Sequence, residues 1–195
     1  MSYVYIGISV LIALVLHELA HGFVSYKLGD PTPKADGRLS LNPLKHLDPV
    51  GTICLFFFGF GWAKPVMIDY RYYKNKKLGV ALVSLAGPFV NLLLGTLGGF
   101  LLSITDNYNL VMFFNTFMTI NVGLGLFNLI PIPPLDGSKV LAAILPKDIY
   151  DIYMSYESLG MILLLCLMMF GTIGTYLTGA VNIICNLILY MFSVF

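Results

Sequence analysis

The chain has 195 residues, of which 58% are hydrophobic and only 11% are charged, and its mean hydropathy is +0.85. Soluble domains carry about 25% charged residues, so this composition excludes a soluble globule and favours a polytopic membrane protein. The net charge of +1 gives no reason to expect nucleic acid as a partner, and the lipid bilayer is the expected environment. All 11 Lys and Arg fall within 27–77 and 139–147, and the positive-inside rule places both intervals in the cytoplasm.

The first apolar segment, residues 3–26, is long enough to cross the bilayer as a helix of about 35 Å. No small-residue cleavage site follows the N-terminus, so we expect this span to be retained. It contains His17, Glu18 and His21 in an HExxH arrangement, in which residues four apart share a helix face. Two imidazoles one turn apart suit zinc, and the carboxylate stays free to act on a metal-bound water.

The loop after this span is rich in Pro and Gly and contains two further residues of metal-binding type, His46 and Asp48. Both also fit hydrogen bonding and capping within a loop. Residues 50–62 are apolar but too few to span as a helix, and basic residues lie on both sides. We therefore expect 50–68 to be re-entrant or β-like, with an amphipathic loop on the membrane surface as the alternative.

Three further spans are predicted at 78–104, 110–130 and 158–177, with a possible fifth at 181–195. In the second of them Gly87, Asn91, Gly95 and Gly99 recur every four residues. Small residues at this spacing let helices approach closely, and the asparagine should face protein rather than lipid. The expected fold is a single all-α transmembrane domain, residues 1–195, with four to five membrane-spanning helices.

The third span ends in a proline-rich stretch that leads to Asp136. Alternation of the spans brings Asp136 back to the side of the membrane where the first span ends, at a depth similar to that of His17 and His21. A catalytic zinc needs three protein ligands and an open position, and Asp136 is the preferred third ligand over Asp48 and His46. The metal would lie about 5 to 15 Å below the cytoplasmic surface, and the Asn91 amide could hydrogen-bond the tetrahedral oxygen.

These residues resemble the site-2 protease family of intramembrane zinc metalloproteases. The resemblance rests on His17–Gly22, Gly87–Asn91, Asn128–Pro131 and Leu135–Gly137. It implies that Asp136 is the third zinc ligand and that Glu18 is the catalytic base. Residues 61–66 resemble the re-entrant segment of the family, which implies that Lys64, Pro65 and Val66 align substrate. The chain shows neither a PDZ-like insertion nor a CBS pair, as in a minimal form of the family.

The leading hypothesis is a zinc endopeptidase, with one Zn²⁺ per chain, that cuts transmembrane protein substrates near their cytoplasmic ends. Its expected location is a prokaryotic cell membrane, with the active site toward the cytoplasm. A catalytically silent family member that binds membrane proteins is the first alternative, although the intact Glu18 argues against it. A metal transporter is the second, but the later spans lack further His or Asp for a relay.

Overall fold

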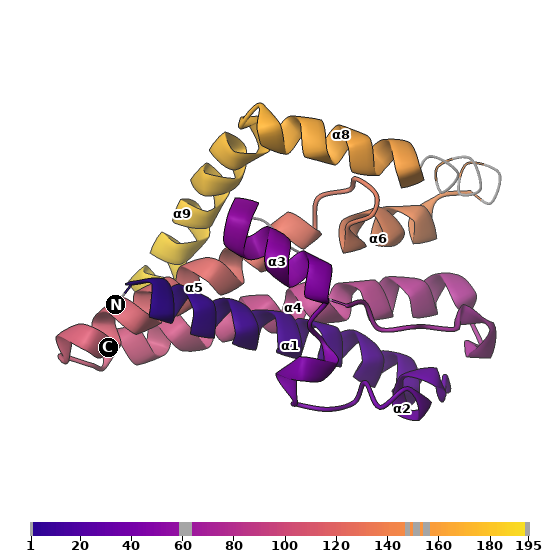
Figure 1. Cartoon of the computed structure of the whole chain (residues 1–195), viewed down its shortest axis with the longest axis horizontal. Helices are drawn as coiled ribbons and strands as arrows, with labels where there is room; N and C mark the ends of the chain where they lie inside the picture. The colour runs from indigo at the N-terminus through magenta and orange to yellow at the C-terminus, as the bar shows by residue number, and fades with distance from the viewer. Residues whose placement is uncertain (1, 59–63, 147–148, 150–152, 154–156, 194–195) are drawn as a thin grey trace.

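The fold is a bundle of long apolar helices, seen in a computed structural model that describes residues 2–58, 64–146, 149, 153 and 157–193. The helices α1 (Ser2–Lys27), α4 (Lys76–Ser103) and α5 (Tyr108–Asn128) pack against one another, and α9 (Thr172–Ser193) packs on α4 and α5 (Figure 1). Each of these four is long and apolar enough to cross a membrane. The described part contains no strand, so the expected all-α membrane fold is confirmed.

Small residues of α4 let its neighbours approach closely. A Cβ added to Gly95 would lie 2.6 Å from Val122 Cγ2 of α5, and one added to Gly99 would meet the side chain of Ile188 of α9. Val122 and Ile188 belong to a core cluster that joins α5 and α9. The stripe of small residues on α4 is therefore a packing surface at these two glycines.

The C-terminal helices differ from the predicted spans at 158–177 and 181–195. The structure instead has a short helix α8 (Glu157–Met169) of 13 residues, followed by the long helix α9. Gly171 has a φ of +71°, a left-handed conformation that only glycine adopts readily, and it ends the first helix. This break lies inside the predicted span 158–177, and α9 covers both the end of that span and most of the possible fifth span at 181–195, so the predicted boundaries differ from the structure here. Figure 1 shows α8 running away from α9 at a sharp angle.

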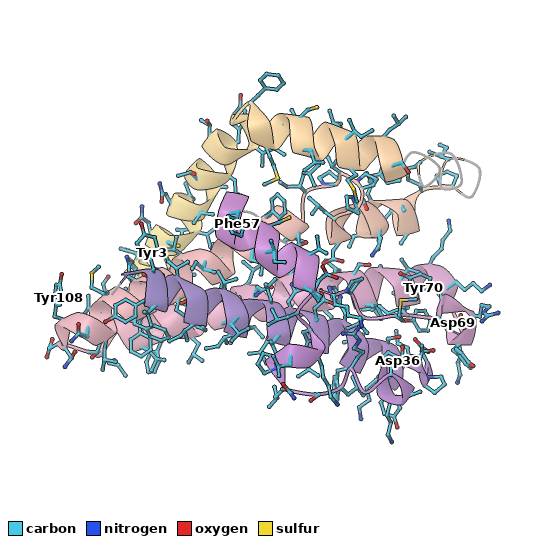
Figure 2. All side chains as sticks on the ribbon, viewed as in Figure 1. Tyr3, Asp36, Phe57, Asp69, Tyr70 and Tyr108 are labelled. Carbon is cyan, nitrogen blue, oxygen red and sulfur yellow. The ribbon has the colours of Figure 1, made fainter. Side chains whose placement is uncertain are left out.

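Short elements connect the long helices. They are α2 (Thr32–Ala35), the 3-10 helices η1 (Pro43–Lys45) and η2 (Tyr70–Tyr72), α3 (Pro49–Phe58) and α6 (Asp136–Ile144). In the predicted re-entrant or β-like region 50–68, the described residues form helix α3 and a stretch from 64 to 69 without regular secondary structure, and residues 59–63 lie outside the described part of the chain. Figure 2 shows Asp36, Asp69 and Tyr70 at one end of the molecule, and Tyr3 and Tyr108 at the other.

The stretch 64–69 is fixed to the rest of the protein by its backbone. The N–H of Lys64 donates to the carbonyl of His46 at 2.8 Å, and the N–H of Asp69 donates to Asp30 Oδ2 at 2.9 Å. Asp30 is fully buried. Burial acts to raise the pKa of this carboxyl, but hydrogen bonds from Thr32, Asp69 and other donors outweigh it and hold the pKa below its ordinary value. A charged anchor therefore holds the end of the stretch in place.

Candidate metal centre

Three side chains from two helices converge on one point. The Nε2 atoms of His17 and His21 are 3.0 Å apart, and Asp136 Oδ2 lies 3.2 Å from the first and 3.1 Å from the second. Tetrahedral zinc, with bonds of about 2.0 to 2.2 Å, separates its ligand atoms by about 3.3 Å. All three residues are buried. The triangle of donor atoms therefore has the size and chemistry that a zinc ion requires.

The other ring nitrogen of each histidine is held by the protein, and this fixes the tautomer. Nδ1 of His21 is 2.7 Å from the carbonyl oxygen of Val83, which can only accept, so Nδ1 carries the proton. Nδ1 of His17 is 2.6 Å from Asn91 Oδ1, again an acceptor. With both protons on Nδ1, the two Nε2 lone pairs face the metal position, as in other histidine-bound zinc sites.

The side chain of Asn91 uses both of its N–H groups in hydrogen bonds within the protein. Its amide nitrogen donates to the carbonyl of Ala13 at 3.2 Å and to Asn121 Oδ1 at 3.1 Å, so both N–H groups are used. Its side chain is 0% exposed. The expected hydrogen bond from Asn91 to a tetrahedral oxygen has no donor left in this arrangement. Asn91 is instead placed to orient His17.

Asp136 reaches the histidines from the first residue of α6. The following residue must be glycine, because a Cβ at Gly137 would collide with the backbone of Leu129 at the end of α5. This close approach brings α6 down onto the bundle. A metal ligand must be deprotonated, and Asp136 Oδ2, within 3.2 Å of both Nε2 atoms, supplies a carboxylate at that point.

Glu18 lies beside the three ligands and makes a separate contact. Its Oε2 accepts a hydrogen bond from the backbone N–H of Val66 at 3.1 Å. A cavity of about 180 Å³ opens here. Its lining includes His17, Glu18, His21, Pro65, Val66, Asp136 and Lys139. The carboxylate, the ligand triangle and the stretch 64–69 therefore share one hollow.

The other sequence candidates lie elsewhere. His46 Nε2 donates to the carbonyl of Ser40 at 2.7 Å, and Asp48 Oδ1 accepts from the N–H of Gly51 at 2.8 Å at the start of α3. Neither residue belongs to a metal-binding group within the described chain. Lys64 is exposed, and it is not among the residues that line the cavity. The structure brings Pro65 and Val66 to the site, but not the Lys64 side chain.

Several residues at the site were not singled out for these roles from the sequence. The Val83 carbonyl and Asn121 support the ligands, Lys139 lines the cavity, and Gly87 packs directly against both imidazoles. Gly87 and Asn91 are four residues apart, so the sequence predicts that they share one face of α4. The sequence does not show that this face packs against α1. A backbone carbonyl such as that of Val83 leaves no signal in the sequence.

A larger hollow of about 780 Å³ lies between α1 and α4 and is separate from the centre. Its lining is almost entirely apolar and includes Leu19, Phe23, Leu85 and Phe89. It contains no group that binds metal or transfers protons. Such a surface fits the lipid side of a membrane helix pair.

Long apolar helices around an HExxH pair and an aspartate define the class of membrane zinc metalloproteases. The model of peptidase family M50 matches residues 103–171. YwhC of Bacillus subtilis, assigned by name to the zinc metalloproteases, is 41% identical over 182 residues, covering 88% of this chain and 83% of that protein. Rip2 of Mycolicibacterium smegmatis, named in the same way, is 33% identical over 159 residues, covering 70% of this chain and 58% of that protein.

The zinc metalloprotease MJ0392 of Methanocaldococcus jannaschii is 29% identical over 188 residues, covering 94% of this chain and 44% of that protein. No solved structure matches the chain significantly. The chain belongs to the site-2 protease family, peptidase family M50. It is a zinc metalloprotease, and the Zn²⁺ expected from the sequence is the cofactor of its relatives.

Replacing Asn91 by alanine separates the two roles considered for this residue. Because the variant loses the acceptor for His17 Nδ1, we expect zinc affinity to fall about 10- to 100-fold and cleavage to recover fully when zinc is saturating. Zinc titration followed by both metal content and cleavage rate measures this, with Asn115→Ala on the exposed face of α5 as control. A cleavage rate that stays low at saturating zinc would show instead that Asn91 hydrogen-bonds the tetrahedral oxygen during the reaction.

Proposed function

We propose that the chain is an intramembrane zinc endopeptidase that hydrolyses peptide bonds in or near the transmembrane segments of membrane protein substrates. The observation that carries this proposal is the convergence of His17, His21 and Asp136 beside Glu18 within a bundle of membrane-length helices. Zinc held by these three ligands would activate a water molecule and polarise the scissile carbonyl. The rest of the reaction falls to the side chains of the protein.

Glu18 is the general base in this proposal. It lies one position after His17 on α1 and lines the same cavity as the metal ligands. Its carboxylate is not part of the group of three residues that could hold the metal. It accepts the proton of the attacking water and returns it to the leaving amine. The hydrogen bond from the Val66 N–H holds Oε2 in place, so the carboxylate is oriented before substrate binds.

The stretch 64–69 is the proposed substrate-binding edge, and it includes Lys64, Pro65 and Val66. The N–H groups of Lys64 and Val66 already donate within the protein. In an extended chain the backbone groups of alternate residues point to opposite sides. The outward groups would be the carbonyl of Pro65, which has no N–H, and the N–H and carbonyl of Met67, and these would pair with an unwound substrate. Met67 is 61% exposed. Backbone pairing holds a segment without demanding a particular sequence.

The active site faces the cytoplasm in this proposal. His17 lies ten residues before the end of α1 at Lys27, which corresponds to about 15 Å along the helix. The basic residues gather at the same end of α1, in the loops between Lys27 and Lys77. Substrates would therefore be cut near their cytoplasmic ends, in a bacterial or archaeal cell membrane.

Removing and restoring the metal tests the proposed function. The protein is purified in detergent, reconstituted in vesicles and supplied with a transmembrane reporter substrate. We expect about one zinc per chain by elemental analysis, cleavage that o-phenanthroline abolishes, and recovery of cleavage when zinc is returned. A metal-free protein that still cleaves, or a fully loaded protein that cuts no transmembrane substrate, would contradict the proposal.

A further inference from the structure

Lys139 brings a positive charge into the cavity that holds the metal centre. It lies three residues after Asp136 on α6, a spacing that puts both residues on the same side of the helix. Its side chain is half-buried and lines the same hollow as Glu18 and the ligands. It therefore faces whatever occupies that hollow.

The charge of Lys139 is unmatched within the described part of the chain, where it makes no hydrogen bond or ion pair. The two carboxylates that share its cavity are engaged elsewhere, Glu18 with the Val66 N–H and Asp136 with the histidines. By contrast, Lys77 at the start of α4 donates to the carbonyl of Leu145 at 2.6 Å. An unpaired ammonium in a partly enclosed site attracts an anionic partner.

The size of the cavity limits what that partner is. Its volume of about 180 Å³ is below the roughly 300 to 1,000 Å³ of most ligand pockets, which is too little for a helix about 10 Å across. An unwound stretch of chain with one or two side chains fits better. Among protein side chains only Asp and Glu are anionic at neutral pH.

We propose that Lys139 is a specificity-determining residue that pairs with an Asp or Glu side chain of the substrate next to the scissile bond. This inference rests on the proposed function, because it assumes that the occupant of the cavity is a peptide being cleaved. The ion pair forms beside the metal centre, where water is partly excluded. It therefore selects substrates with an acidic residue close to the cut.

The test is a charge exchange between enzyme and substrate. Reporter substrates carry Glu, Gln or Lys at each position within three residues of the cleavage site, and are offered to the wild type and to Lys139→Gln, Lys139→Arg and Lys139→Glu. We expect the wild type to prefer the best Glu substrate over its Gln counterpart by about 10-fold in kcat/KM. The Lys139→Gln change should remove that preference, Lys139→Arg should keep it, and Lys139→Glu should shift it to the Lys substrate.

Zinc content is measured for every variant, so that a damaged centre is recognised, and Lys76→Gln, an exposed lysine outside the cavity, is the control. A loss of kcat that is equal on Glu and Gln substrates would overturn the inference, since Lys139 would then act on the reacting oxygen. A preference unchanged by Lys139→Glu would also overturn it, as expected if Lys139 contacts lipid headgroups. A wild type that cleaves none of the substrates would instead refute the proposed function itself.

Discussion

Replacing Glu18 by glutamine is expected to lower the rate of peptide-bond cleavage by about 10²- to 10⁴-fold, the usual contribution of a general base, while zinc stays bound. Glutamine keeps an oxygen that accepts from the Val66 N–H, so the contact between α1 and the stretch 64–69 survives. It cannot take up the proton of the attacking water. Single-turnover cleavage in vesicles, together with zinc content per chain, measures both effects.

The matched control for this change is Asp106→Asn. It is the same acid-to-amide substitution, in the turn between α4 and α5 and so distant from the centre, and it should leave cleavage unchanged. Full activity of Glu18→Gln with zinc in place would remove Glu18 from the chemistry. Loss of zinc together with activity would show that Glu18 supports the metal rather than the proton transfer.

Replacing Gly87 by alanine is expected to eliminate the metal centre. A Cβ at this position would lie 2.6 Å from His17 Cε1 and 2.7 Å from His17 Nε2, and closer still to His21 Nε2. Both imidazoles would have to move, so we expect zinc affinity to fall by at least about 100-fold, the largest loss usually found when a residue that supports a metal ligand is changed. Cleavage should fall with it. Zinc titration by a fluorescent competitor and the reporter assay measure the two losses.

Gly123→Ala on α5 is the control, since its Cβ would meet only Val181 Cγ2 at an ordinary 3.8 Å. Alanine favours helix over glycine by about 1 kcal/mol, so α4 itself should tolerate the Gly87 change. The circular dichroism spectrum should therefore stay helical in both variants. A Gly87→Ala protein that binds zinc with wild-type affinity would show that the imidazoles are not packed against α4 as described.

The first three long helices and the shared helix face of His17 and His21 were predictable because their signals are local, whereas Asp136 was chosen from the alternation of the spans and from the family resemblance. An apolar run long enough to span a membrane reports a helix directly, and the bounds of α1, α4 and α5 lie within two residues of the predicted spans. The helix boundaries in the C-terminal region were not predictable, because no local signal marks them. Residues 158–195 are apolar without interruption, so hydropathy gave no boundary, and the break depends on the conformation of Gly171.

Residue type and spacing along the chain were enough to place HExxH within a membrane-length helix and an aspartate after the third span. The surroundings of these residues became known from the packing of the helices. The contact of α4 with α1 brings Asn91 within hydrogen-bond distance of His17. The stretch 64–69 folds back onto α1, so the N–H of Val66 donates to Glu18. Such partners lie 48 to 74 residues apart, and their pairing depends on how helices pack rather than on any local pattern.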